Sequence, residues 1–451
     1  MTTPNLRREL NLRDLVLLMV VAVVNVNALP LIAAEGWRAV SYYILAFVLF
    51  LVPLGVAVAE FGKRYPGEGG IYLWTRECFG DFHAFLSGWC YWTNNLFYIP
   101  SVVFIIVGVL TYVGGPDAAK LSDNVNFMVV ASIVMLWLVT LMHIRGLKVG
   151  KWLNNIGGFG VWVSLAFLSV IGILAYTKSG ASETPFNLED ALPSLYQYGS
   201  LSALSVAMYS LVGLELGSVM GDEIKDTQKI IRKAVFIAGL ISILLYIVGV
   251  VALIVAVPAS EIGAVTGMMQ AVSNVTVRLH LEALIPFAAI VLFLAVLGVC
   301  SAWLAGSARI PFVMGVDVYL PKALGKTHPK WGTPVNALLV QGIVCTILLL
   351  ISLSASTVRE IYEKLLKCSI IIQLIPFVYL FAGQYKLGIQ RWLAVIGLAA
   401  TLFGIAFVFV PSSGIENVLV FELTLIVGTL IMLGLACFLF WIARKKQTAV
   451  T

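Results

Sequence analysis

Long apolar stretches separated by short polar connections run along almost the whole chain. A bilayer core of about 30 Å requires roughly 20 mostly apolar residues in a spanning helix. Twelve stretches meet that length: 15–34, 39–60, 82–113, 125–143, 152–176, 192–220, 234–257, 283–313, 335–354, 361–383, 392–411 and 418–443. The pattern predicts an all-α polytopic membrane protein with twelve transmembrane helices. No connection is long enough to hold a separate soluble domain, so we expect a single membrane domain over residues 1–451.

Two connections carry shorter helical patterns. Residues 258–281 mix Glu261 and Arg278 with Met268 and Met269, as expected of short amphipathic helices at the mouth of a bundle, where they would act as a lid. In residues 61–81 a glycine-rich turn precedes an apolar stretch too short to span. We expect an interfacial helix there.

Composition excludes a water-soluble protein. Hydrophobic residues make up 60% of the chain and charged residues 12%, about half the roughly 25% usual in soluble domains. Cytoplasmic loops retain Lys and Arg during insertion. With the amino terminus inside, 22 of the 29 basic residues lie on the inner side, and the outer side keeps Arg38, Lys120, Lys178, Arg278, Arg359, Lys364 and Lys367. We therefore expect a multi-pass plasma-membrane protein with both termini cytoplasmic.

The charge distribution and the cysteine spacing limit which binding partners are expected. The net charge of +6 is scattered over short loops, which argues against nucleic acid, and the six cysteines lack the spacing of a metal site or a disulfide framework. The spans hold no nucleophile and base set, so no enzyme, metal or cofactor is predicted. The bilayer and a small-molecule substrate are the expected partners, and the oligomeric state stays open. A channel is less favoured because no filter segment or pore ring is found.

Two spans are interrupted. The first contains Asn25-Val26-Asn27-Ala28-Leu29 before Pro30, which lacks an N–H and disfavours helical geometry at Leu29. The sixth contains Tyr209-Ser210 and then Gly213 and Glu215 within an apolar run. Breaks in a spanning helix persist only where protein or a wet cavity meets the freed backbone groups. The simpler interpretation is a kink at Pro30 and close packing at the glycines.

The breaks occupy corresponding positions if the chain holds two inverted five-helix repeats, at about 14–176 and 192–385, followed by two further helices at about 390–443. Matching interruptions in two halves point to a midplane site in secondary transporters. We therefore favour substrate binding by Asn25, Val26, Asn27, Ala28, Leu29, Tyr209, Ser210, Gly213 and Glu215. Glu215 could instead cap a helix near the inner face.

Other spans add weaker candidates. Asn94 and Asn95 lie deep in the third span, where their amides either line a cavity or bond between helices. Ser301 and Ser307 in the eighth span are candidates for a cation-coupling site, although serine often bonds its own helix. Tyr91 and its neighbours could offer ring faces to a cationic substrate or form an interfacial belt.

Several motifs resemble the amino acid-polyamine-organocation transporter superfamily, bacterial-type amino acid permeases in particular. They cover about residues 15–385 and comprise Ala59-Glu60-Phe61, Tyr65-Pro66-Gly67-Glu68-Gly69-Gly70 with Trp74, Gly88-Trp89, Gly213-Leu214-Glu215, Glu223-Ile224-Lys225-Asp226, and the run from Arg309 through Leu320-Pro321-Lys322 and His328-Pro329 to Gly332-Thr333-Pro334.

The resemblance implies the five-plus-five inverted-repeat fold, alternating access, and substrate binding by the backbone of the first and sixth helices. Two departures stand out. The first break lacks the family's glycines, and the fifth helix has Gly157-Gly158 after Asn155-Ile156, without the lysine that many members carry. We expect an amino acid transporter working by proton- or sodium-coupled symport or by exchange, with Glu215 in a gate. Polyamines or other organic amines are the alternative substrates.

Overall fold

The computed structural model describes residues 11–67, 69–145, 147–193, 198–219, 224, 227–317, 319–354, 357–410 and 417–448. Regular structure in these ranges consists of helices, which confirms the all-α prediction. In the amino-terminal half they are α1 Leu12–Val23, η1 Val26–Ala28, α2 Leu29–Ala33, α3 Arg38–Ala46, η2 Phe47–Leu51, α4 Val52–Arg64, α5 Ile71–Phe79, α6 Asp81–Thr111, η3 Tyr112–Gly114, α7 Pro116–Ala119, η4 Lys120–Asp123, α8 Val125–Ile144, α9 Leu147–Ser179 and α10 Leu188–Ala191.

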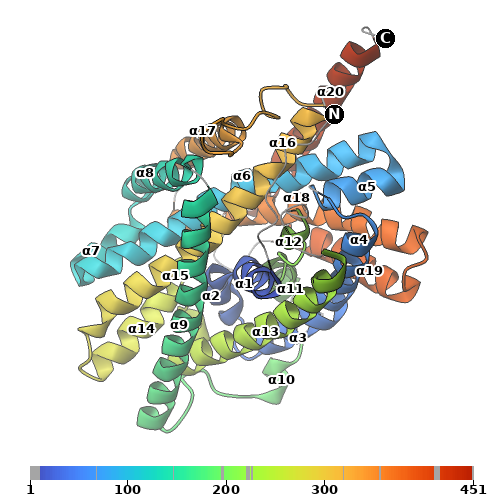
Figure 1. Cartoon of the computed structure of the whole chain (residues 1–451). Helices are drawn as coiled ribbons and strands as arrows, with labels where there is room; N and C mark the ends of the chain where they lie inside the picture. Colours follow the sequence, from blue (N-terminus) through green and yellow to red (C-terminus); the bar gives the residue numbers. More distant parts are fainter. Residues whose placement is uncertain are drawn as a thin grey trace.

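The second half begins with α11 Tyr198–Ser210 and α12 Leu216–Val219. It continues with α13 Thr227–Ala256, η6 Ala259–Glu261, α14 Gly267–Arg278, α15 Leu284–Ser307, α16 Arg309–Val316, α17 Val335–Ile351, η7 Ser352–Ser354, α18 Val358–Lys386, α19 Arg391–Phe407 and α20 Val418–Thr448. Long helices surround a centre occupied by the short helices α1, α11 and α12 (Figure 1).

Within the described residues, eight helical segments are long and apolar enough to cross a membrane: Arg38–Arg64, Asp81–Gly114, Val125–Ile144, Asn155–Ser179, Ile230–Ala256, Leu284–Gly315, Val358–Lys386 and Val418–Lys446. Each overlaps a stretch that the hydrophobic pattern predicts. Two further predicted stretches coincide with the 17-residue helices α17 and α19. The other two, 15–34 and 192–220, coincide with the interrupted helices.

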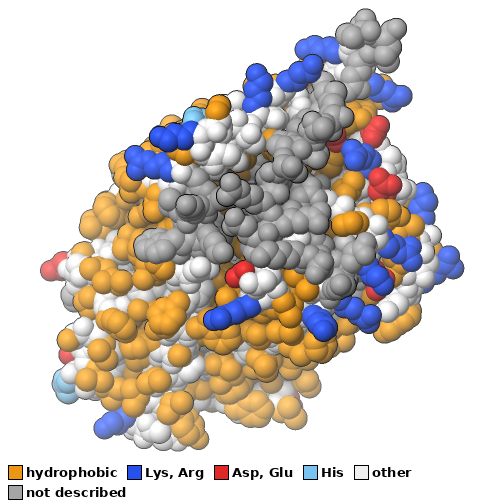
Figure 2. All heavy atoms as spheres, in the orientation of Figure 1, with side chains coloured by type: hydrophobic (Ala, Val, Ile, Leu, Met, Phe, Trp, Pro, Cys, Tyr) orange, Lys and Arg blue, Asp and Glu red, His pale blue; other side chains and the backbone are white. Residues whose placement is uncertain are grey.

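The outer surface of the bundle is apolar. Phe159, Phe236 and Trp392 are each at least 65% exposed, a pattern that a water-soluble surface avoids. Hydrophobic side chains cover much of the face shown in Figure 2, whereas most Lys and Arg on that face lie along its upper and right edges. Helices α6 and α18 are the most buried of the candidate spans and α20 is the least. The core therefore lies around α6 and α18.

The two predicted connecting helices are present. Helix α5 follows the glycine turn, and η6 and α14 form in the connection between α13 and α15. Helix α5 is fixed to the end of α16 through Asp317, whose Oδ2 accepts from Tyr72 Oη at 2.7 Å and Arg76 Nη1 at 2.8 Å. Burial, and then the hydrogen bond to Asp317, raise the pKa of Tyr72, so its hydroxyl stays protonated and donating.

Helices α9 and α15 meet at backbone distance. A Cβ added to Gly157 would lie 2.2 Å from the Cα of Gly298, and one added to Gly160 would lie 2.7 Å from the nitrogen of Ala295. Small residues permit such close approach and gain dispersion contacts along the interface. Gly157 lies in the part of the fifth span where many family members carry a lysine. Here it lets α9 pack directly against α15.

We predict that Gly157→Ala lowers the free energy of unfolding by about 1–3 kcal/mol, because the new methyl group has no space against Gly298. Thermal unfolding of the purified protein in detergent measures this. Gly434→Ala is the matched control, since nothing lies within 4 Å of the Cβ that it adds to α20. Equal unfolding temperatures for the two variants would contradict the close contact.

Candidate functional site

The first break lies at Val24 and Asn25. Helix α1 ends at Val23, Val24 has ψ 81° and Asn25 has ψ 82°, and a single 3₁₀ turn over Val26–Ala28 leads into α2. Asn25 is 4% exposed. Its backbone N–H donates to Tyr246 Oη at 2.7 Å and its Nδ2 donates to Tyr98 Oη at 2.6 Å. The break is therefore held by two tyrosines from other helices.

The expectation that Leu29 belongs to the unwound segment is wrong. Leu29 has φ −53° and ψ −49°, and it begins α2 with Pro30 beside it. A proline at the first positions of a helix costs no intrahelical hydrogen bond and its fixed φ suits the helix. Pro30 therefore starts the second half of the broken helix, and the unwinding occurs upstream of it.

Of the other predicted residues of this segment, Val26, Ala28 and Leu29 pack against neighbouring helices, and the side chain of Asn27 is not described. Ala28 and Leu29 are buried, and Leu29 contacts Gly249 of α13. Val26 and Pro30 line a small apolar cavity beneath α14, together with Met268 and Met269. The side chain of Asn27 falls outside the described residues.

The second break separates α11 from α12 and covers residues 211–215. Gly213 has φ +139°, a backbone conformation that residues with a side chain rarely adopt. Its N–H donates to Glu215 Oε2 at 3.0 Å. Glu215 is fully buried, and its Oε1 accepts from Tyr91 Oη of α6 at 3.2 Å. The carboxylate thus folds back onto the break, where it is bound by a backbone amide and a phenol.

The two breaks touch each other. A Cβ at Gly213 would lie 2.8 Å from the carbonyl carbon of Ala22 and 2.9 Å from the nitrogen of Val23. Only glycine permits this approach, because both its conformation and its missing side chain are required. Residues about 190 positions apart in the chain therefore form one site at the end of α1.

Tyr246 of α13 bonds to both breaks. Its Oη accepts from the Asn25 N–H and lies 2.6 Å from the carbonyl oxygen of Val23 and 2.7 Å from that of Ser210. The hydroxyl has one proton, which serves one of the two carbonyls at a time. The ring stacks on Tyr43 at 4.6 Å between centroids. One phenol thus caps the end of α1 and the end of α11 together.

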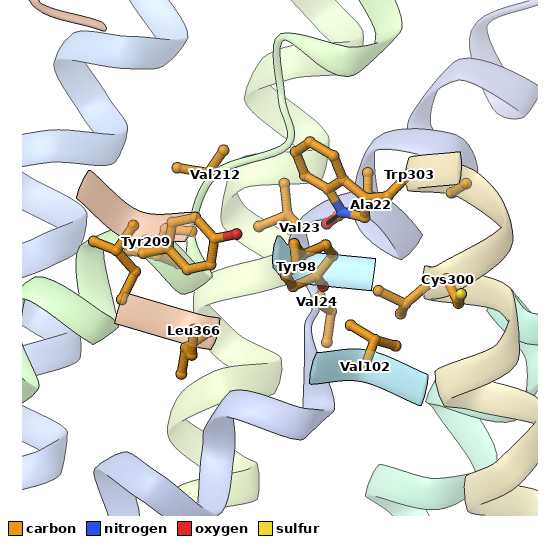
Figure 3. Packing of buried hydrophobic residues seen from close by; sticks show 14 of the residues in the cluster. Ala22, Val23, Val24, Tyr98, Val102, Tyr209, Val212, Cys300, Trp303 and Leu366 are labelled. Atoms are coloured by element: carbon orange, nitrogen blue, oxygen red, sulfur yellow. Dashed lines mark hydrogen bonds between the residues drawn. The ribbon is translucent and has the colours of Figure 1, made fainter. Parts of the chain in front are cut away.

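An aromatic cluster surrounds the junction. Trp303 of α15 donates its indole N–H to the carbonyl oxygen of Ala22 at 3.1 Å. Tyr98 lies between Trp303 and Tyr209, with edge-to-face contacts at 5.7 and 6.0 Å between centroids (Figure 3). Such rings beside the buried Glu215 present both π-faces and a carboxylate, a combination suited to a ligand with a cationic group.

A polar network connects α6, α11 and α18. Tyr209 Oη and Ser369 Oγ lie 2.6 Å apart, and Ser369 Oγ donates to Asn94 Oδ1 at 3.3 Å. Asn94 Nδ2 donates to the carbonyl oxygen of Tyr91 at 2.6 Å and to Gln373 Oε1. Asn94 and Tyr209 are thereby brought to the same site.

The remaining candidates have other contacts. Ser210 Oγ donates to Ala207 O, while Asn95 Nδ2 donates to Tyr91 O and leaves Oδ1 without a hydrogen bond among the described residues. Ser301 Oγ lies 2.9 Å from His143 Nε2 of α8, and Ser307 exchanges hydrogen bonds with Gln341 of α17. The coupling role predicted for Ser301 and Ser307 stays a prediction.

Comparison with known proteins identifies the family. Residues 10–444 match the family described as amino acid permease. The chain belongs to the amino acid permease family. This permease is 27% identical to an uncharacterized transporter of Legionella pneumophila, over 98% of its own length and 97% of the relative. It is 23% identical to a probable agmatine/putrescine antiporter of Lactococcus lactis, over 85% and 80% of the two chains. A glutamate/gamma-aminobutyrate antiporter of Lactococcus lactis is 21% identical, over 88% and 82%.

Sequence reasoning missed Tyr98, Tyr246, Trp303, Ser369 and Gln373 of the permease site, although part of the signal was present. Tyr98 lies on the same helix face as the predicted candidates Tyr91, Asn94 and Asn95, at i+7 from Tyr91. Ser369 and Gln373 at i and i+4 form a similar polar face in the tenth span. Tyr246 and Trp303 gave no such signal, because a lone aromatic residue in an apolar span is ordinary.

We predict that Tyr246→Phe lowers the unfolding free energy of the permease by about 1–3 kcal/mol, because it removes the buried hydroxyl that bonds to the Asn25 N–H and to the carbonyl oxygen of Ser210. Thermal unfolding in detergent is the measurement. Tyr385→Phe, at a side chain that is 51% exposed, is the matched control. If both variants unfold at the wild-type temperature, Tyr246 does not hold the breaks.

Proposed function

We propose that this permease is a secondary active transporter that carries amino acids across the plasma membrane by alternating access. The observation that carries the proposal is the contact between two broken helices, with a buried carboxylate and an aromatic cluster around it. Backbone left unwound at membrane depth is retained where it serves a ligand or ion. The family, and relatives named as antiporters, support transport over other activities.

The proposed topology has twelve spans in two inverted five-helix repeats, followed by two extra helices. The first repeat would cover about residues 14–176 and the second about 192–385. The breaks in α1–α2 and α11–α12 support this arrangement because they fall in the first helix of each half. Both termini would be cytoplasmic, as the distribution of Lys and Arg favours.

Exchange is the transport mode that we favour, since two of the relatives are named as a probable agmatine/putrescine antiporter and a glutamate/gamma-aminobutyrate antiporter. Coupling to H⁺ or Na⁺ is the other mode. Glu215 is the group that we propose for gating or proton coupling, because it is fully buried and bonded to Gly213 of the break and to Tyr91 of the neighbouring α6.

Polyamines or other organic amines are the second candidate substrates. Glu215 and the rings of Tyr91, Tyr98 and Trp303 would suit a cation without a carboxylate. The relative named as an agmatine/putrescine antiporter supports this candidate. A channel is disfavoured because two of the relatives are named as antiporters.

Counterflow in liposomes tests the proposal. Purified permease is reconstituted into liposomes that are loaded with one unlabelled solute. Uptake of labelled amino acids, agmatine, putrescine and gamma-aminobutyrate is then measured with and without imposed pH and sodium gradients. We expect saturable amino acid counterflow. Saturable putrescine uptake without competition by any amino acid would replace the leading substrate class by the second. Flux without saturation or counterflow would indicate a channel.

We predict that Glu215→Gln reduces the response of transport to an imposed pH gradient while the protein stays folded. The neutral amide retains an oxygen that accepts from the Gly213 N–H, but it no longer titrates. Initial rates with and without the gradient measure the response. Glu189→Gln, on an exposed residue of α10, is the matched control. A gradient response equal to that of the wild type would exclude Glu215 as the coupling group.

A further inference from the structure

Gln373 carries an unpaired hydrogen-bond donor at the centre of α18. The side chain is fully buried. Its Oε1 accepts from Asn94 Nδ2, whereas its Nε2 has no hydrogen-bond partner among the described residues. An unpaired polar group in such a position costs about 1–3 kcal/mol. Gln384 of the same helix also has an amide that is unpaired within the described part of the chain, but Gln373 is the one that is bonded to Asn94 of the site.

The orientation of this amide follows from its neighbours. Asn94 Nδ2 also donates to the carbonyl oxygen of Tyr91 at 2.6 Å. A backbone carbonyl can only accept, so the Asn94 atom that faces it must be the nitrogen. The same nitrogen faces Gln373, and the Gln373 atom toward it must therefore be the oxygen. The NH₂ group of Gln373 is consequently the free end, and the network fixes it there.

The network leads directly to the second break. Asn94 Oδ1 accepts from Ser369, and Ser369 bonds to Tyr209, one residue before α11 ends at Ser210. Tyr91, whose carbonyl orients Asn94, donates its own hydroxyl to Glu215. The free donor of Gln373 thus belongs to the same polar cluster as the buried carboxylate of the site.

One backbone donor at each break is already paired. The Asn25 N–H is bonded to Tyr246 Oη, and the Gly213 N–H is bonded to Glu215 Oε2. A substrate carboxylate requires N–H or O–H donors, and the glycine-free first break does not offer the Asn25 N–H. Glu215 and the rings around it favour the ammonium end of a ligand instead. The carboxylate end of a zwitterion needs a donor, and the NH₂ group of Gln373, unpaired among the described contacts, supplies one.

We propose that the Gln373 side-chain NH₂ binds the carboxylate of the transported amino acid and so selects amino acids over amines. This inference rests on the proposed function and assigns part of its specificity to α18. A diamine has donors alone and leaves Gln373 unpaired, which disfavours it.

The test measures KM for each amino acid that shows counterflow and for the amine that lacks its carboxyl group. Arginine with agmatine and ornithine with putrescine are two such pairs. Gln373→Glu keeps the size and the accepting oxygen but replaces the donor by a carboxylate. We expect the KM ratio of amino acid to amine to rise about tenfold or more, because like charges are brought together. Gln384→Glu is the matched control on the same helix, since Gln384 is also fully buried and has no hydrogen bond to this network among the described contacts.

Gln373→Met supplies a second variant that removes the donor without adding charge, and it should raise the same ratio by a smaller factor. Thermal unfolding identifies the variants that remain folded. Amino acid counterflow with an unchanged ratio in the folded Gln373 variants, or an equal change in Gln384→Glu, overturns this inference and leaves the proposed function intact. Transport of amines alone by the wild type also overturns it. Absence of counterflow for every solute refutes the proposed function itself.

Discussion

A break in a buried helix leaves backbone N–H and C=O groups that must find partners inside the protein, and in this permease the hydroxyl of Tyr246 meets several of them. It accepts from the Asn25 N–H and lies within hydrogen-bond distance of the carbonyl oxygens of Val23 and Ser210. The Trp303 indole N–H donates to the carbonyl oxygen of Ala22. The backbone groups at the end of α1 are therefore hydrogen-bonded to neutral aromatic side chains of the protein. The geometry of the site depends on these bonds.

Glycines allow the helices around this site to pack at backbone distance. Gly213 brings the second break against Ala22 and Val23, and Gly157 brings α9 against Gly298 of α15. A side chain at Gly213 would push the second break away from Ala22 and Val23, whose carbonyl oxygens are bonded to Trp303 and Tyr246. Close packing and hydrogen bonding are therefore one constraint here, since the donors reach the carbonyls only while the helices touch.

The polar groups of the site are divided in a way that bears on specificity. Glu215 and the surrounding rings form the part that suits a cation, while the Asn94 and Gln373 amides of the same polar cluster form a part with a free donor. A ligand with both charges would pair both parts, and a ligand with one charge would pair only one. The amide orientation matters more than the identity of the residues, because a flipped Gln373 would present an acceptor.

The sequence by itself determined the helical class, the positions of the eight long apolar helices and the existence of both breaks, because apolar length, Gly213, Pro30 and a carboxylate inside an apolar run are local signals. It misjudged the first break: Pro30 was expected to disrupt Leu29, yet proline is tolerated at a helix start, and the unwinding falls at Val24 and Asn25. Only the tertiary structure decided which side chains meet. Tyr98, Tyr246, Trp303 and Gln373 come from four helices, and nothing in their local sequence specifies their partners. Contacts between distant residues depend on helix packing, so they are absent from any single apolar pattern.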